Sequence, residues 1–205
     1  LWAEAADLEP RSPAAYPWDT AASSEAITYF ARALGAARSG RFEQARADLE
    51  TLSGLRAEVE ASSPYWGTQV EIQHLSALAW LQFEEGDQEA GLETMQQAAR
   101  MEAGTDKHPV TPGEVLPARE LLADMYLELG SFPEALASYE AALERSPNRF
   151  NSLYGAGMAA ARIGEMTKAS GYFEALLEVS ERSDTERPRL VEVRGFMNAH
   201  SAEAA

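Results

Sequence analysis

Alanine and aromatic residues recur along residues 121–148 at helical intervals, and a single glycine interrupts them. Gly130 ends the first helical stretch. Directly after it, Ser131 and Glu134 match the S-x-x-E pattern of a capping box. Pro133 falls in the first turn of the second stretch, where a missing backbone N–H is tolerated. The pattern predicts two helices joined by a tight turn.

The same pattern recurs when the chain is aligned on other glycines. Gly164 lies 34 residues after Gly130, and Gly86 and Gly40 give two further alignments. In every case the residues seven before and five after the glycine are alanine or glycine. Small residues are needed there because the two helices of a hairpin cross most closely at these points. The eight positions are Ala33, Ala45, Ala79, Gly91, Ala123, Ala135, Gly157 and Ala169.

The hairpin of residues 121–148 resembles the 34-residue tetratricopeptide repeat, since it has that repeat's small, aromatic and turn positions and a closing proline. These residues are Ala123, Tyr126, Gly130, Ala135, Tyr139 and Pro147. The resemblance implies an all-α fold, a right-handed superhelical stack of antiparallel helix hairpins with a C-terminal capping helix. Four hairpins are expected, at about 24–60, 64–103, 116–148 and 150–181.

The spacing between the turn glycines is uneven, at 46, 44 and 34 residues. The earlier repeats therefore carry extra residues, either in longer helices or in loops. Residues 61–69 and 104–117 are the candidate insertions, and the prolines of the second forbid regular helix.

The two ends of the chain suggest further elements. Residues 1–23 resemble the end of a preceding repeat followed by a linker, and residues 183–205 are expected to form the capping helix and a tail. The N-terminal segment should pack on the first hairpin or on a second copy of the chain. Because the chain begins at Leu1 and not at methionine, we expect a processed chain or an excised piece.

Composition narrows the classes of partner. The formal net charge is −16, which disfavours nucleic acid and anionic membrane surfaces. No apolar run reaches the roughly 20 residues of a membrane span. The absence of cysteine excludes disulfides and thiolate chemistry but leaves the compartment open, either cytoplasmic or exported.

No catalytic set, cofactor motif or metal site is visible. The three histidines, His74, His108 and His200, lie in no ligand motif, and no pair of them has helical i, i+4 spacing. His108 stands in the proline-rich segment of residues 104–117, where it could either order the loop or contact a ligand. An enzyme is the least favoured class.

In the family that the chain resembles, the first helix of each hairpin lines a concave surface. That resemblance makes nine residues the candidate groove contacts: Phe30, Leu34, Trp80, Phe83, Glu120, Asp124, Tyr154, Met158 and Arg162. The first two repeats present apolar and aromatic groups there, whereas the third presents acids. A partner with apolar anchors and basic residues would complement this surface.

The sequence thus favours a non-catalytic module that binds a protein or peptide. One alternative is a structural scaffold segment of a longer repeat array. Another is a carrier of a small molecule or metal that uses the insertions at 61–69 and 104–117. Exposed Phe30, Trp80 and Tyr154 would favour the binding module, and burial of these side chains would favour the scaffold.

Overall fold

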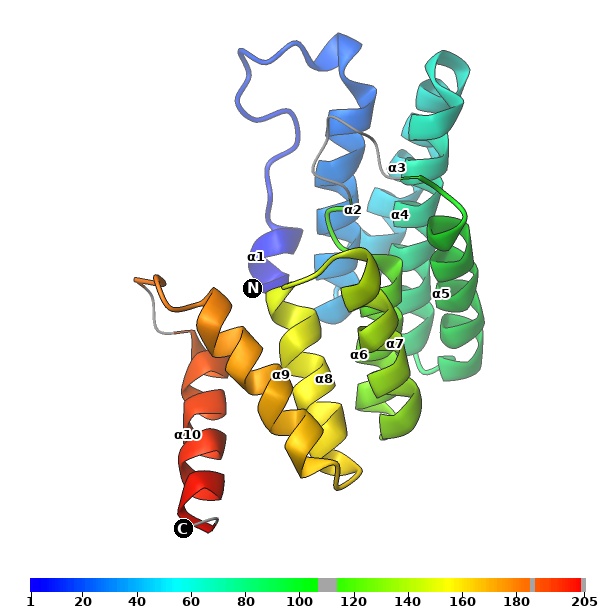
Figure 1. Cartoon of the computed structure of the whole chain (residues 1–205). Coiled ribbons are helices and arrows are strands. Elements are labelled where there is room, and N and C mark those ends of the chain that lie inside the picture. The colour runs from blue at the N-terminus through cyan, green and yellow to red at the C-terminus, as the bar shows by residue number, and fades with distance from the viewer. Residues whose placement is uncertain (107–113, 185–186, 204–205) are drawn as a thin grey trace. The chain divides into compact units, whose positions relative to one another are not determined.

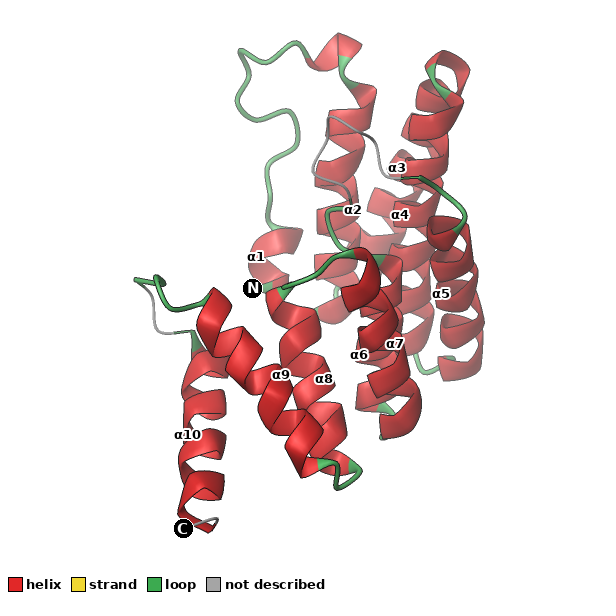
Figure 2. Cartoon of the chain, viewed as in Figure 1, coloured by secondary structure: helices red, strands yellow, loops and turns green. Residues whose placement is uncertain are grey.

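The computed structural model describes residues 1–106, 114–184 and 187–203 of the chain. Helices account for the regular structure of these residues, and no strand occurs among them (Figure 2). The chain divides into two compact units, residues 1–121 (unit 1) and residues 122–205 (unit 2). The division falls inside one helix, between Leu121 and Leu122.

Unit 1 contains a short N-terminal helix, a 3-10 turn and two long hairpins (Figure 1). Each helix contacts the next one along the chain from α1 to α5, and α2 also contacts α4. The elements are α1 (Trp2–Ala6), η1 (Trp18–Thr20), α2 (Ala22–Arg38), α3 (Phe42–Ser62), α4 (Pro64–Glu84) and α5 (Gln88–Ala103).

Unit 2 begins within α6 and continues through four more helices. Helix α8 contacts both α7 and α9, and α10 contacts α9. The helices are α6 (Ala118–Glu128), α7 (Phe132–Arg145), α8 (Phe150–Arg162), α9 (Met166–Val179) and α10 (Pro188–Glu203).

The four glycines on which the sequence pattern was aligned all occupy tight turns. Gly40, Gly86, Gly130 and Gly164 have φ angles of 75°, 101°, 74° and 83°. Side chains with a Cβ rarely adopt this left-handed backbone conformation, so glycine is the natural residue there. The predicted hairpin turns are confirmed.

The eight small positions are buried, as the predicted helix crossings require. At Gly157, an added Cβ would lie 2.4 Å from the ring of Phe173 on α9. At Gly91, it would lie 2.8 Å from the carbonyl oxygen of Ala79 on α4. No larger side chain fits at these two positions without movement of the neighbouring helix.

One local prediction was wrong. Ser131 does occupy the N-cap position of α7, but its side chain makes no capping hydrogen bond. For residues 61–69 the structure decides between the two alternatives of longer helices and loops, because α3 continues to Ser62 and α4 starts at Pro64. The extra residues there lengthen helices, with 21 residues each in α3 and α4 against 13 in α8.

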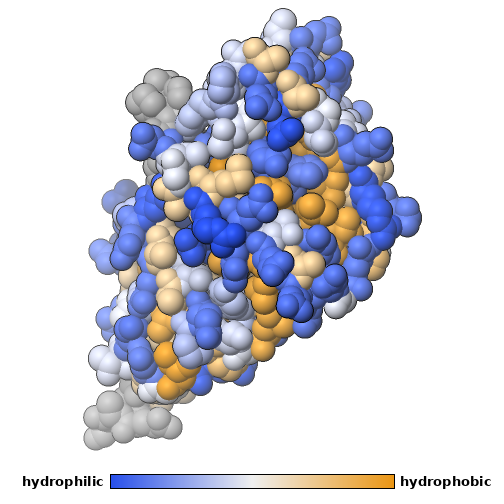
Figure 3. Space-filling model, turned by 90° about the vertical axis from the view of Figure 1, so that its right-hand side faces the viewer, coloured by the Kyte–Doolittle hydropathy of each residue, from blue (hydrophilic) through white to orange (hydrophobic). Residues whose placement is uncertain are grey.

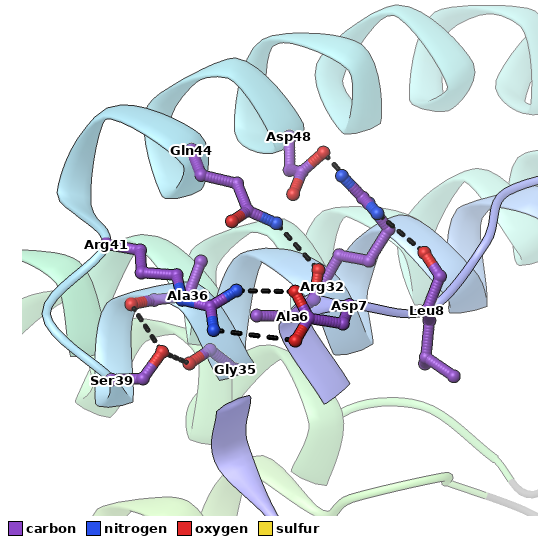
Figure 4. Close-up of polar contacts among 10 residues, drawn as sticks. All are labelled: Ala6, Asp7, Leu8, Arg32, Gly35, Ala36, Ser39, Arg41, Gln44 and Asp48. Atoms are coloured by element: carbon purple, nitrogen blue, oxygen red, sulfur yellow. Dashed lines mark hydrogen bonds and ion pairs between the residues drawn. The ribbon is translucent and has the colours of Figure 1, made fainter. Parts of the chain in front are cut away.

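The N-terminal segment packs on the α2–α3 hairpin, as expected, although its helix ends at Ala6 (Figure 4). Gln44 of α3 donates to the carbonyl oxygen of Ala6 at 2.7 Å. Arg41 forms an ion pair with Asp7 at 2.5 Å, and its donated hydrogen bond lowers the pKa of the Asp7 carboxyl.

Close backbone approach and a second arginine complete this attachment. An added Cβ at Gly35 would lie 2.5 Å from the carbonyl oxygen of Trp2, so α1 rests directly on the backbone of α2. Arg32 donates to the carbonyl oxygen of Leu8 at 2.6 Å and pairs with buried Asp48 at 3.1 Å (Figure 4).

The core of unit 2 extends onto the last helix. Leu190 and Val193 of α10 are buried in the same hydrophobic cluster as Phe173 of α9, and Phe196 packs on Phe173 with ring centroids 4.9 Å apart. Helix α10 therefore covers the apolar side of the last hairpin, which is the role predicted for a capping helix.

The face in Figure 3 is mostly hydrophilic, with smaller hydrophobic areas between the charged side chains. None of the helices in the described part of the chain is both long and apolar enough to cross a membrane.

Candidate functional site

Unit 2 has a groove beside α8, with a volume of about 320 Å³. This volume lies at the lower end of the range of about 300–1,000 Å³ that is usual for ligand sites. Apolar and aromatic side chains dominate its wall, with one acid and one base. The lining residues are Leu127, Glu128, Gly130, Phe132, Tyr154, Met158 and Arg162.

Helical spacing brings three predicted contact residues into this groove. Tyr154, Met158 and Arg162 are four residues apart on α8, so they share one face of the helix. The opposite wall comes from the end of α6 and the turn that follows, where Gly130 permits the chain to reverse before Phe132. Tyr154 and Met158 are partly exposed and Arg162 is exposed.

Tyr154 is held from two sides by α10. Its hydroxyl donates to the Glu192 carboxylate at 2.6 Å, and the Arg189 guanidinium lies 4.7 Å from the centre of its ring. Partial burial, together with the hydrogen bond to Glu192, raises the pKa of Tyr154 to about 12. The hydrogen bond to Glu192 fixes the orientation of the phenol.

Arg162 and Phe132 form the other end of the groove. The Arg162 guanidinium lies 5.4 Å from the centre of the Phe132 ring, within the range of a cation–π contact. Arg162 makes no ion pair with any of the described residues. Its charge remains available on the groove wall.

The predicted acidic stretch of the third repeat is not an open surface. Glu120 is buried, which contradicts its expected position in a solvent-facing groove. Asp124 is partly buried and accepts a hydrogen bond from the Tyr139 hydroxyl on α7. Of the acids on this helical face, Glu128 is the exposed one that lines the groove of unit 2.

The predicted aromatic surface of the first two repeats is core. Phe30, Leu34, Trp80 and Phe83 are buried, so they are not accessible groove contacts, and the burial of Phe30 and Trp80 is the outcome that favours a scaffold. The reason lies within unit 1. The Arg38 guanidinium covers the Trp80 ring at 3.9 Å, and Phe83 packs on the same ring with centroids 5.3 Å apart.

The remaining candidates lend no support to a bound ion or small molecule. His108 lies outside the described residues. Among the residues that the structure describes, no group of three or more His, Asp or Glu side chains could hold a metal ion. Residues 61–69 belong to α3 and α4 rather than to a loop.

Several groove residues were not predicted from the sequence. Leu127 and Phe132 flank the turn at Gly130, and their position beside a turn glycine could have indicated them. Arg189 and Glu192 of α10 carried no such signal, since they approach Tyr154 from another helix.

Comparisons with known proteins identify the repeat. One tetratricopeptide-repeat model matches residues 120–185, and another matches residues 26–50 and 72–97, so the matches together cover more than half of the chain. The solved structure of MamA AMB-1 is 15% identical with a TM-score of 0.50, covering 87% of this chain and 86% of that chain. No curated protein matches the chain. The all-α hairpin fold expected from the sequence is thereby confirmed, and the chain belongs to the tetratricopeptide-repeat family.

Proposed function

We propose that this protein is an interaction module that binds a segment of a partner protein in the groove of unit 2. Tetratricopeptide-repeat proteins are generally non-catalytic interaction or scaffold modules. The observation that carries the proposal is the groove itself, because it unites the partly exposed residues Tyr154 and Met158 with Leu127 and Phe132.

An apolar side chain of the partner would lie against this wall. Burying one Leu-sized or Phe-sized side chain contributes about 1.5–3 kcal/mol, which makes it the main anchor of a short segment. The basic residues expected in the partner lose their support, because Glu120 is buried and Asp124 is bound to Tyr139. Our proposal therefore keeps the apolar anchor and not the basic contact.

Unit 1 fits the scaffold alternative better than a second binding face. Its inward-facing aromatic residues Phe30 and Trp80 are buried, as a structural segment requires. We therefore assign recognition to unit 2 and a supporting role to unit 1. Self-association through the exposed residues Leu1, Trp2 and Leu8 of the N-terminal segment stays a prediction.

The test is selection of peptides from a random array with the purified chain, followed by affinity measurement on two variants. Met158→Glu places a carboxylate in the apolar wall, where an anchor would leave it unpaired and poorly solvated. We expect it to weaken the selected peptides at least about tenfold. Ala137→Glu adds the same charge on an exposed position of α7 and is expected to change affinity less than about twofold.

Circular dichroism establishes that both variants are folded. Tyr154→Ala is a second, milder substitution in the groove. Selected peptides that bind Met158→Glu and Tyr154→Ala as tightly as the unaltered chain would refute the proposed site.

A further inference from the structure

One arginine, Arg162, lines the groove of unit 2, and a second, Arg189, contacts the Tyr154 ring of its wall. Both lie against aromatic rings rather than carboxylates. Arg162 lies over Phe132 at 5.4 Å, and Arg189 lies over Tyr154 at 4.7 Å. Both side chains are exposed. Arg189 also donates to the Asn151 side-chain oxygen at 2.9 Å. Neither arginine forms an ion pair with a carboxylate of the described residues.

A cation–π contact positions a guanidinium through its charge and needs no hydrogen bond from its five N–H donors. Within the described residues, Arg162 uses none of these donors and Arg189 uses one. Both groups are pre-positioned, which lowers the entropic cost of binding an acceptor.

The carboxylates near these arginines do not remove that capacity. Glu192 accepts the hydrogen bond of the Tyr154 hydroxyl. Glu128 also lines the groove and is engaged in an interaction of its own. At both ends of the groove, the groups that can still hydrogen-bond to a partner are therefore mainly N–H donors. Carboxylates are the protein groups that match a guanidinium edge best.

The spacing of the two ends defines a pattern in the partner. Tyr154, whose ring contacts Arg189, lies eight residues before Arg162 on α8. This separation is a rise of about 12 Å at 1.5 Å per residue. Met158 lies midway between them. In an extended segment, side chains i, i+2 and i+4 point to one side, and i to i+4 spans about 13 Å.

We propose that the groove recognises an extended acidic segment in which an apolar residue stands between two acidic residues, each two positions away. This inference rests on the proposed function, since the apolar residue is the anchor against Met158. The two acidic side chains pair with Arg189 at one end and Arg162 at the other.

Three synthetic heptapeptides test the pattern. The first has glutamates at its second and sixth positions and leucine at its fourth, with serine elsewhere. The second has the same composition with the glutamates moved to positions two and three. The third has lysine in place of both glutamates. Affinity and location are read together from the NMR signal of the Met158 methyl group, labelled with ¹³C.

We expect the first peptide to bind about tenfold more tightly than the lysine peptide and about threefold more tightly than the rearranged one. Arg189→Glu and Arg162→Glu should each weaken it about tenfold. Arg189→Gln provides a milder lesion if the charge reversal disturbs α10.

Arg194→Glu is the matched control on the same helix. Arg194 is exposed, makes no ion pair with the described residues, and lies about 140° around α10 from Arg189 at 100° per residue. It should change the affinity less than about twofold, because only the general attraction of charge is altered.

Two outcomes separate the inference from the function on which it rests. Peptides that shift the Met158 signal with equal affinity would leave the groove as a binding site but overturn the acidic pattern. Equal weakening by Arg194→Glu would overturn it as well. If no peptide shifts the Met158 signal at millimolar concentration, the groove itself is wrong and both proposals fail.

Discussion

The same repeat positions form core in unit 1 and a groove in unit 2. Counted from the turn glycine, the residues ten and six positions earlier are Phe30 with Leu34 in α2, and Ser76 with Trp80 in α4. All four are 1% exposed. The equivalent residues of α8, Tyr154 and Met158, are partly exposed and line the groove. The position of a residue within the repeat therefore does not determine whether its side chain is exposed to solvent.

The arginine beside the buried ring of unit 1 differs from those beside the groove of unit 2. In unit 1, Arg38 pairs with Glu84 and also lies over the Trp80 ring. In unit 2 the guanidinium groups of Arg162, Arg187 and Arg189 lie on the rings of Phe132, Phe150 and Tyr154. An arginine in an ion pair uses its N–H donors within the protein. An arginine that contacts only a ring still has these donors available for a partner.

The largest expected effect comes from removing the equivalent aromatic side chains. Trp80→Ala should lower the free energy of unfolding by about 3–5 kcal/mol, because a fully buried tryptophan leaves a cavity. Tyr154→Ala should lower it by about 1 kcal/mol or less, since its ring is half-exposed and the substitution removes one hydrogen bond.

Urea unfolding measures both changes. All four tryptophans lie in unit 1, so their fluorescence reports that unit, and circular dichroism reports the whole chain. If Trp80→Ala lowered the free energy of unfolding only slightly and Tyr154→Ala lowered it strongly, the assignment of Trp80 to the core and Tyr154 to an open groove would be wrong.

A smaller effect is expected from two glycines of unit 2. An added Cβ at Gly155 would lie 2.1 Å from the Tyr139 ring, which its hydrogen bond to Asp124 holds in place. Gly155→Ala should therefore cost about 1–3 kcal/mol, despite a gain of up to about 1 kcal/mol in helix propensity. Thermal melts followed by circular dichroism provide the measurement.

Gly171→Ala is the control for that substitution. No atom lies within 4 Å of a Cβ at this position of α9, so only the gain in helix propensity remains. It should raise the melting temperature. Equal behaviour of the two variants would mean that α7 and α8 are not as closely packed as Gly155 indicates.

The sequence predicted the hairpins well because their determinants are local. Positive φ at Gly130 and zero exposure at Ala135 follow from the turn and from the crossing of two adjacent helices. Accessibility was predicted poorly because it depends on side chains distant in sequence. The residues near Trp80 in the sequence do not indicate that Arg38 will cover its ring. Those near Tyr154 do not indicate that its hydroxyl will bond to Glu192.

The smallest expected effect concerns pH and the two terminal helices. The pKa of Tyr154 is raised to about 12 by partial burial and by Glu192, against about 10 in an unfolded chain. Because the folded pKa is the higher one, the stabilisation is complete below pH 10 and is lost as pH rises toward 12. Alkali should therefore loosen α10 from α8.

The attachment of α1 in unit 1 has the opposite dependence. The pKa of Asp7 is lowered by the hydrogen bond from Arg41, so that contact is present above about pH 4 and is lost only as pH falls below it. Between pH 10 and 12 the ion pair that attaches α1 should therefore persist. Over the same range, tyrosinate absorbance of the unaltered chain minus that of Tyr154→Phe should show one group titrating near pH 12. A difference curve centred near pH 10 would show that Glu192 does not hold Tyr154, and that α10 leaves this end of the groove open.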